Sequence, residues 1–306
     1  MFDLHGKVAI VTGGSYGFGP MFGDALAHAG ANIVLTARSA ELLDAEAAGI
    51  RERHGVEVLT VAADISVEAD ILRVVQSAID TFSHIDVLVN NAGISDLRGL
   101  PSEHYDTETF KRIMDVDLVG LFVMSREVGR HMLARGSGSI INIASILGDG
   151  GGEYSLPSYS AAKGAVIQMS KQLAVEWADR GVRVNVISPN YFVTEMTRPV
   201  LEGLGMADWI RSRTPARRLG ELDDLRGPIV FLASDESAYV TGLNMAVDGG
   251  FGASRGTFQM VPGHHSWNVS SGLGAVGDSY PGLVPLPREE WKMGIPGIHY
   301  PMPDAL

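Results

Sequence analysis

The sequence contains no cysteine, which excludes disulfide bonds and metal sites built on thiolates. It has no apolar run close to the length of about 18 residues that suggests a membrane span, and no secretory leader is apparent before the strand-like segment at residues 8–11. Acidic residues outnumber basic ones: the chain has 36 Asp and Glu against 24 Lys and Arg, which gives a net charge of −12. This balance argues against binding to a phosphate backbone. We therefore expect a cytoplasmic protein with no membrane or nucleic-acid partner.

Short β-branched segments alternate with segments of helical periodicity through most of the 306 residues. Several of the expected strands are apolar throughout, which is typical of strands covered on both faces. The expected strands are Val8–Thr12, Asn32–Thr36, Val56–Ala62, Ile85–Asn90, Ser139–Ala144, Arg183–Ser188 and Asn244–Val247. The expected helices are Pro20–Ala29, Ala40–His54, Glu68–Phe82, Thr107–Ala134, Ser158–Arg180 and Leu222–Ala233. This alternation predicts an α/β fold, a doubly wound parallel sheet of the Rossmann type, over residues 1–255.

Residues 256–306 differ in composition, because seven of the 14 prolines and two of the four tryptophans follow residue 256. A disordered extension is one interpretation. The many aromatic and aliphatic residues instead favour an irregular C-terminal arm packed on the domain or on a neighbouring subunit. The adjacent His264 and His265 project in different directions and have no carboxylate at ligand spacing, so we expect no metal site there.

The segment "VTGGSYGFGP" places Gly13, Gly17 and Gly19 between the first strand and the first helix. Glycines permit a tight turn and let backbone N–H groups approach a pyrophosphate at a helix N-terminus. Pro20 suits the first helical turn, where a missing N–H costs nothing. A glycine pattern in isolation could be purely structural, but this one opens a repeating β/α pattern and so indicates a dinucleotide site.

The end of the second strand indicates which dinucleotide is bound. An NAD-binding protein offers a carboxylate to the adenosine ribose there, whereas this chain has Ala37 followed by Arg38. A guanidinium can bind a 2′-phosphate, although a solvated arginine is the alternative. We expect NADP(H) to be slightly preferred, with NAD(H) possible.

Tyr159 and Lys163 lie one helical turn apart in "SYSAAKGA" and therefore share a helix face. A nearby ammonium stabilises phenolate and lowers the tyrosine pKa, so the pair can transfer a proton. Ser145 ends the strand "SIINIAS" at the sheet edge where ligands bind, and can hold a substrate oxygen. Most isolated Tyr-x-x-x-Lys pairs are surface coincidences, but the glycine turn makes this combination specific.

With these motifs the chain resembles the short-chain dehydrogenase/reductase family from about Leu4 to Phe251, including Asn90-Asn91-Ala92-Gly93 and "YVTGLNMAVDGG". In its detailed sequence the chain is most similar to the branch of the family with gluconate 5-dehydrogenase-like and 3-oxoacyl-carrier reductase-like members. The resemblance implies a small alcohol or ketone substrate and a homo-oligomer, a tetramer or dimer, formed partly through the two long helices. It implies a general acid/base at Tyr159, a substrate-orienting Ser145, and a Lys163 that binds the nicotinamide ribose. The implied cofactor-binding residues are Gly13, Ser15, Tyr16, Gly17, Phe18, Gly19, Arg38, Asp64, Ile65, Asn91, Ala92, Gly93, Tyr159, Lys163, Pro189, Asn190, Phe192 and Thr194.

Three positions depart from the family pattern. Asp117 stands where the family usually has an asparagine that completes the proton relay, and its charge would tend to raise the pKa of Lys163. Asn190 replaces a glycine beneath the nicotinamide. It could be structural, with a left-handed backbone, or it could contact substrate. Tyr16 occupies a position where many NADP-using relatives carry a basic residue. We include Asp117 among the candidate catalytic residues.

The mouth of the site is expected between residues 94–99, 147–157 and the segment after Thr194. Candidate substrate contacts are Ile94, Tyr154, Tyr191 and Met196, which favour a substrate with some apolar or aromatic surface. The segment "TEMTRPVLEGLGMADWIRSRTP" has the apolar spacing of a mobile lid or of a helix packed on the core. Arg98 could bind an acid or remain solvated.

The sequence thus predicts an NAD(P)-dependent oxidoreductase that interconverts a secondary alcohol and a ketone. A cofactor-binding protein without turnover is the alternative, supported only by Asp117 and Asn190. A dehydratase or epimerase would need catalytic residues beyond those present.

Overall fold

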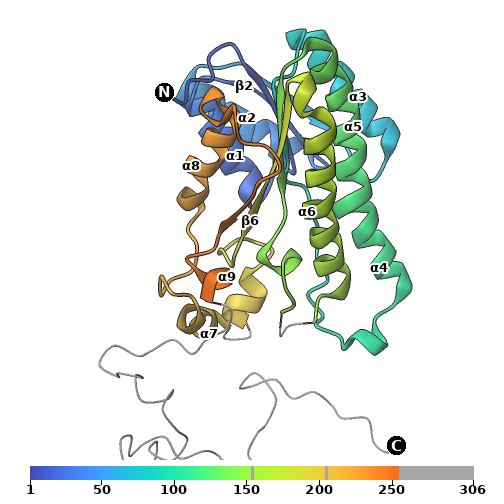
Figure 1. Ribbon diagram of the computed structural model, residues 1–306, viewed down its shortest axis with the longest axis vertical. Coiled ribbons are helices and arrows are strands. Elements are labelled where there is room, and N and C mark those ends of the chain that lie inside the picture. Colours follow the sequence, from blue (N-terminus) through green and yellow to red (C-terminus); the bar gives the residue numbers. More distant parts are fainter. Residues whose placement is uncertain (153–154, 204–205, 255–306) are drawn as a thin grey trace, which may run out of the picture.

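The computed structural model describes residues 1–152, 155–203 and 206–254. One sheet of seven strands, in the order β3-β2-β1-β4-β5-β6-β7, runs through them, and every neighbouring pair is parallel (Figure 1). The predicted doubly wound α/β fold is confirmed. The predicted arm at 256–306, with its histidine pair, lies outside the described residues. The strands are β1 Val8–Thr12, β2 Asn32–Ala37, β3 Val58–Ala62, β4 Val87–Asn90, β5 Gly138–Ile143, β6 Val182–Pro189 and β7 Asn244–Val247.

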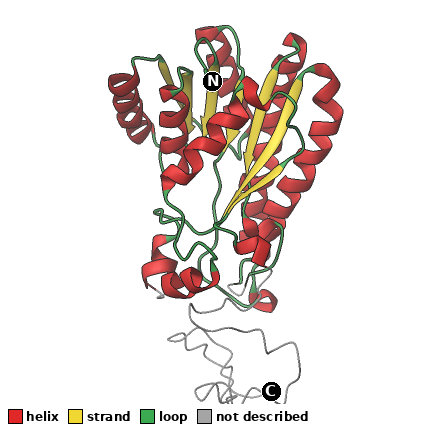
Figure 2. Cartoon of the chain, turned by 60° about the vertical axis from the view of Figure 1, so that its left-hand side comes forward, coloured by secondary structure: helices red, strands yellow, loops and turns green. Residues whose placement is uncertain are grey.

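Helices cover both faces of the sheet (Figures 1 and 2). One face carries α1, α2 and α8, and the other carries α3, α5 and α6, as the two large hydrophobic clusters confirm. Shorter elements α4, α7 and α9 lie toward the carboxyl ends of the strands. The helices are α1 Phe18–His28, α2 Ala40–His54, α3 Glu68–Phe82, α4 Thr107–Met114, α5 Leu121–Arg135, α6 Pro157–Trp177, α7 Met206–Arg213, α8 Arg226–Ala233 and α9 Phe251–Ser254.

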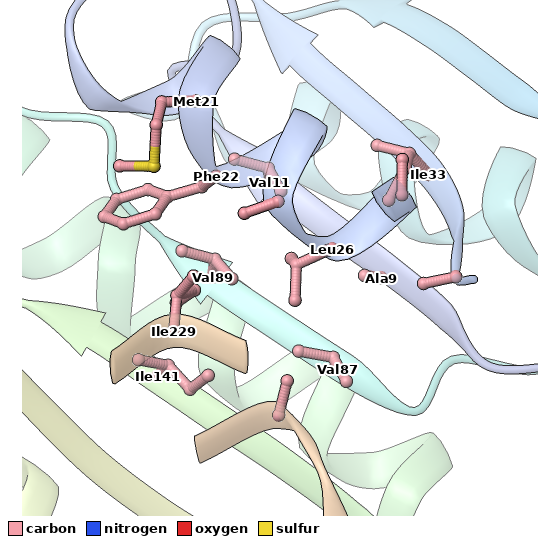
Figure 3. Packing of buried hydrophobic residues seen from close by; sticks show 14 of the residues in the cluster. Ala9, Val11, Met21, Phe22, Leu26, Ile33, Val87, Val89, Ile141 and Ile229 are labelled. Carbon is pink, nitrogen blue, oxygen red and sulfur yellow. The ribbon is translucent and has the colours of Figure 1, made fainter. Parts of the chain in front are cut away.

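The core on the α1 side forms because this helix presents a continuous apolar face to the sheet. Phe22 and Leu26 of α1 are fully buried, and they lie over Val11 of β1 and Val89 of β4 (Figure 3). Burying one such side chain contributes about 1.5–3 kcal/mol. Ile229 of α8 lies beside Val89 of β4 and Ile141 of β5 in the same cluster, so residues more than 200 positions apart are fixed against one another.

The strand order reverses beside β1, which pairs with β2 on one side and β4 on the other. In open α/β sheets this reversal leaves a crevice at the carboxyl ends of the strands, because the connecting segments turn to opposite faces. Here the segments after β1 and β4 meet directly, since the Asn91 side chain donates to the Thr12 carbonyl at 3.0 Å. The Thr12 hydroxyl accepts from the backbone N–H of Asn91 and of Ala92, each at 3.0 Å.

The long helix expected at Thr107–Ala134 is interrupted by a π-helical turn at Asp115–Gly120. This turn approaches the loop after β3 so closely that a Cβ on Gly120 would lie 2.3 Å from the Ile65 carbonyl oxygen. Only glycine fits this approach. The turn rotates the helix so that Asp117 becomes completely buried. Periodicity did not show the interruption, because the apolar pattern continues on both sides of it.

The glycine turn before α1 generates a stability prediction. A Cβ at Gly19 would lie 2.0 Å from the carbonyl oxygen of Gly13, which is backbone and cannot move aside cheaply. We expect Gly19→Ala to lower the free energy of unfolding by about 1–3 kcal/mol, as overpacking does. The measurement is urea denaturation followed by circular dichroism.

The matched control is Gly49→Ala, in the interior of α2. Its Cβ would meet only the end of the Arg53 side chain, which is flexible. Alanine favours the helix, so this variant should gain up to about 1 kcal/mol. A Gly19→Ala protein as stable as the unmodified protein would show that the turn is not constrained in this way.

Candidate active site

A cleft of about 600 Å³ opens at the carboxyl edge of the sheet, at the reversal of strand order. It brings together residues from the turns after β1, β2, β3, β4, β5 and β6. Gly19 and Asp117 do not line it. The sequence-predicted residues that do are Gly13, Ser15, Tyr16, Gly17, Phe18, Arg38, Asp64, Ile65, Asn91, Ala92, Gly93, Ile94, Ser145, Tyr159, Lys163, Pro189, Asn190, Phe192, Thr194 and Met196.

The glycine turn has the geometry and the donors that an anionic group requires. Gly13 and Gly17 have φ of 68° and 63°, in the left-handed region that favours glycine. The N–H of Gly17, at the start of α1, donates to a carboxylate oxygen of Glu195 at 3.3 Å. A carboxylate from the far side of the cleft therefore already satisfies this donor, and the helix N-terminus favours that negative charge. A pyrophosphate fits the same position by charge and by hydrogen bonding.

The β2 end of the cleft carries a positive charge beside a carboxylate. Arg38 follows β2 directly, and Ser39 caps α2 by accepting from the Leu42 N–H at 3.5 Å. Hydrogen bonds from Ser66 lower the pKa of Asp64, and the positive charge of Arg38 lowers it further. The described residues place no carboxylate directly after β2, as the sequence indicated, so the donors here suit a phosphate.

The catalytic candidates come from one strand end and one helix. Ser145 lies two residues beyond β5, while Tyr159 and Lys163 are on the first turns of α6, which begins at Pro157. Ser145 hydrogen-bonds the Tyr159 phenol. The Lys163 ammonium lies 5.5 Å from the centre of the Tyr159 ring and donates to the carbonyl of Ile143 at 3.1 Å. The structure thus brings all three predicted side chains into one cleft.

The electrostatics of Tyr159 are less simple than the spacing suggested. Removal of the phenol from water raises its pKa, which is the largest influence. The Lys163 ammonium and the Ser145 hydrogen bond lower this pKa, while the negative charge of Asp117 raises it. The pKa of Tyr159 ends above its ordinary value, so the expected lowering by Lys163 is present but is outweighed.

Asp117 does not line the cleft but lies beside Lys163. It is fully buried in the π turn, with one carboxylate oxygen accepting from the Ile94 N–H at 2.7 Å and the other 3.2 Å from the Lys163 ammonium. Lys163 itself is only 3% exposed. Burial raises the pKa of Asp117, and the charge of Lys163 opposes that rise. Burial lowers the pKa of Lys163, but Asp117 and Tyr159 raise it more, so the pair favours a charged lysine.

Asn190 keeps the turn after β6 in a way that differs from the expectation. Its φ is not positive, so no left-handed backbone is needed at this position. The amide nitrogen donates to the Asp248 carbonyl at 3.2 Å, which links the ends of β6 and β7. The amide oxygen is shielded from solvent and has no hydrogen-bond partner among the described residues. The amide nitrogen is therefore structural, while Asn190 as a residue also lines the cleft.

A smaller pocket of about 80 Å³ adjoins the cleft on the side of the Ser145 and Tyr159 side chains. Two predicted substrate contacts, Tyr191 and Met196, line it, while Ile94 lines the larger cleft and Tyr154 lies outside the described residues. The other lining residues lie mostly in the segments expected to form the mouth. The full set is Ser95, Leu97, Ser145, Ile146, Leu147, Leu156, Tyr159, Asn190, Tyr191, Met196 and Thr197.

The segment after Thr194 forms a packed helix. In α7 the side chains of Met206 and Ile210 are buried in a cluster with Leu201 and Leu219, and Leu97, Leu156 and Tyr191 pack against it. The structure therefore favours the interpretation of a helix packed on the core. Arg98, the other residue left open, binds Asp96 at 2.7 Å and Asp106 at 2.8 Å.

Sequence reasoning missed one wall of the cleft. This wall belongs to α4 and the π turn, and its spacing is that of a single helix face. That spacing was a usable signal, but only packing shows which face meets the cleft. The residues are Glu108, Lys111, Arg112, Asp115 and Val116.

Comparisons with known proteins agree with this geometry. The family described as Enoyl-(Acyl carrier protein) reductase matches residues 14–252. The 2-dehydro-3-deoxy-D-gluconate 5-dehydrogenase of Bacillus subtilis is 41% identical over 252 residues, 82% of this chain and 96% of its own. The gluconate 5-dehydrogenase of Gluconobacter oxydans is 36% identical over 254 residues, 83% and 98% of the two chains. A solved gluconate 5-dehydrogenase from Burkholderia cenocepacia, in complex with NADP and tartrate, superposes with a TM-score of 0.78 at 35% identity, covering 82% and 97%.

The structure also bears on metals and membranes, within the residues it describes. Over residues 1–152, 155–203 and 206–254 no three His, Asp or Glu side chains gather as a metal site would require. Within the same ranges no helix combines the length and the hydropathy needed to cross a bilayer.

The Asp117–Lys163 pair generates a prediction of pH dependence. The negative charge of Asp117 raises the pKa of Tyr159, so Asp117→Asn should lower that pKa. Alcohol oxidation needs the deprotonated phenol, and its rate is lost as pH falls through this pKa. We expect the variant to remain active and the acid limb of its kcat/KM profile to move to lower pH.

Asp80→Asn is the control, because Asp80 is an exposed carboxylate on α3 that bonds only Gln76 among the described side chains. Its acid limb should coincide with that of the unmodified protein. An acid limb of Asp117→Asn that stays in place, or moves to higher pH, would disprove the coupling between Asp117 and Tyr159.

Proposed function

The chain belongs to the short-chain dehydrogenase/reductase family of NAD(P)-dependent oxidoreductases, and we propose that it interconverts a secondary alcohol and a ketone through Ser145, Tyr159 and Lys163. One observation carries the proposal. The Tyr159 phenol lies between a hydrogen-bonding serine and a buried ammonium, in the same cleft as a glycine turn whose Gly17 N–H donates to the Glu195 carboxylate. A surface coincidence of tyrosine and lysine would not place all of these groups together.

The proposed chemistry assigns each residue one task. In ketone reduction the Ser145 hydroxyl holds the carbonyl oxygen, and the Tyr159 phenol donates its proton to that oxygen as the alcohol forms. In alcohol oxidation the Tyr159 phenolate accepts the same proton. Lys163 holds the charge that stabilises the phenolate, and the Ile143 carbonyl and Asp117 fix its position. A bound nicotinamide supplies the hydride for reduction and accepts it for oxidation.

We propose that the cofactor is held by the glycine turn, by Asp64 and Asn91, and by the segment from Pro189 to Thr194. NADP(H) is the proposed preference because Arg38 stands at the end of β2 with no carboxylate in its place. The complex of the Burkholderia cenocepacia relative with NADP supports this choice. Tyr16, which lines the cleft at 59% exposure, supplies no charge for a phosphate. NAD(H) therefore remains the alternative.

The names of the relatives suggest sugar acids and sugar alcohols as substrates. A cofactor-binding role without turnover is the second candidate function, because Asn190 and Asp117 replace family residues inside the site. We also propose a homo-oligomer. Phe122 of α5 and Val175 of α6 are 38% and 80% exposed on the helices expected to form its interface, and an interface would cover such side chains.

Replacing the phenol separates an enzyme from a binding protein. Tyr159→Phe should lower kcat by about 10²–10⁴-fold, the usual contribution of a positioned acid or base, while cofactor binding changes little. Turnover is read by absorbance of the reduced nicotinamide, and binding by its fluorescence.

Tyr105→Phe is the matched control, because the Tyr105 hydroxyl bonds the Ser158 hydroxyl at 2.8 Å outside the cleft. It should keep most of the activity. Equal activities of the two variants would remove Tyr159 from the proposed mechanism and favour the second candidate function.

The cofactor preference rests on one charge, so it can be tested by one substitution. Arg38→Gln should lower kcat/KM for NADP(H) by about 10- to 100-fold, because a hydrogen bond to a charged group contributes about 1.5–3 kcal/mol. The value for NAD(H), measured under the same conditions, should change by less than about 3-fold. A higher kcat/KM with NAD(H) than with NADP(H) in the unmodified protein would overturn the preference.

A further inference from the structure

Among the residues that the structure describes, the substrate-side pocket beside Ser145 and Tyr159 is lined by no carboxylate, ammonium, guanidinium or imidazole group, and its only ionisable side chains are the phenols of Tyr159 and Tyr191. Its walls are aliphatic, from Leu97, Leu147 and Leu156, and half-exposed Met196 stands at its margin, shared with the cofactor cleft. Apolar walls with a few placed polar groups are typical of sites for neutral ligands. Gluconate, for which some relatives are named, is an anion, so an uncharged lining bears directly on which substrates this pocket can bind.

The cations on adjoining segments are already compensated. Lys163 lies 3.2 Å from the Asp117 carboxylate, and Arg98 binds both Asp96 and Asp106. Arg38, Lys111 and Arg112 line the larger cleft but do not reach the substrate-side pocket. A substrate carboxylate entering this pocket would lose its hydration without gaining a counter-charge, and such burial is strongly unfavourable. The Asp117 charge behind Lys163 would add repulsion.

The pocket nevertheless includes residues with uncharged hydrogen-bonding groups that lack a partner among the described residues. Ser95 lines the pocket that Ser145 and Tyr159 also line. Its hydroxyl is shielded from solvent and has no partner in the described part of the chain. A shielded hydroxyl without a partner is unfavourable, so a ligand that hydrogen-bonds it gains affinity. The amide oxygen of Asn190 is shielded in the same way.

We propose that this pocket binds the apolar end of an uncharged ketone or secondary alcohol, with Ser95 contacting a second neutral oxygen of the substrate. The proposal rests on the proposed function, because it takes the reacting oxygen to lie between Ser145 and Tyr159. The volume limits what enters. About 80 Å³ is roughly half of the 150 Å³ cavity that holds a benzene molecule, so the pocket accepts a short alkyl chain or one edge of a ring. On this proposal the sugar alcohols suggested by the relatives' names remain candidate substrates, whereas the charge of sugar acids disfavours them.

The first experiment compares ketones that differ by one charge. Methyl 4-oxopentanoate and 4-oxopentanoate have the same reacting carbonyl, and only the second is an anion at neutral pH. We expect kcat/KM to be at least about 10-fold higher for the ester. Calorimetry on the cofactor-bound protein supplies a second readout, in which the ester binds and the acid does not. D-gluconate, assayed in the oxidation direction, is a second anionic compound in the comparison.

Variants of Met196 test whether charge causes the discrimination. Met196→Arg places a cation at the pocket margin, where the half-exposed chain can accommodate it, and should raise the acid-to-ester ratio by about 10-fold. Met196→Gln, of similar length without charge, should leave that ratio low. An equal rise in both variants would show that polarity rather than charge is responsible, and would contradict the proposal.

A second pair tests Ser95. 3-Hydroxybutan-2-one has a neutral hydroxyl that butan-2-one lacks, and Ser95→Ala should reduce the preference for the hydroxyketone by about 3- to 10-fold. An unchanged preference would remove Ser95 from the substrate site. Higher kcat/KM for 4-oxopentanoate or D-gluconate than for the neutral compounds would overturn the inference and leave the proposed function intact. Turnover of none of them, with cofactor bound, would count against the proposed function itself.

Discussion

A buried ammonium group organises this site. Lys163 has almost no contact with solvent, and a charge in that position is stable only when opposite charge and hydrogen bonds surround it. Asp117 supplies the charge from the π turn, and the Ile143 carbonyl supplies the hydrogen bond from the end of β5. The absence of a side chain at Gly93 lets the pair lie against the backbone after β4, because a Cβ there would come within 2.9 Å of Asp117. Three separate segments are thereby fixed around one nitrogen.

This arrangement explains why the sequence revealed some features and not others. The glycine turn and the Tyr159–Lys163 pair are local patterns, and their spacing alone determines that they share a turn or a helix face. The strands and helices were also predictable, because their periodicity persists over many residues. Spacing alone did not show the ion pair, because residues 117 and 163 meet across a π turn, and only the family resemblance indicated that Asp117 lies near Lys163. The Gly17–Glu195 contact likewise depends on how the far wall of the cleft folds back.

Two residues depart from the family pattern, Asn190 and Asp117, and only the packing of the chain shows which contacts their side chains make. Asn190 was expected either to preserve a left-handed turn or to contact substrate. Its φ is not positive, and its amide joins the ends of β6 and β7. Asp117 was expected to add charge near Lys163, and its position at 3.2 Å agrees with that expectation. In both cases the sequence identified the position, and the structure defined which atoms of the side chain are used.

The charges of the site also affect the protonation state of Tyr159 before the reaction. A phenol whose pKa lies above its ordinary value of about 10 holds its proton at neutral pH. The positive charge of Lys163, which lowers the pKa of Tyr159, is balanced by the negative charge of Asp117. The attraction of Lys163 for the phenolate is therefore reduced. The site as built therefore starts as a proton donor, which suits reduction of a ketone, and alcohol oxidation requires that the phenol first lose its proton. Burial of the phenol is the main cause of this protonation, and the buried Asp117 carboxylate adds to it. The same carboxylate also balances the Lys163 charge, so that this ammonium is less available to an anionic substrate.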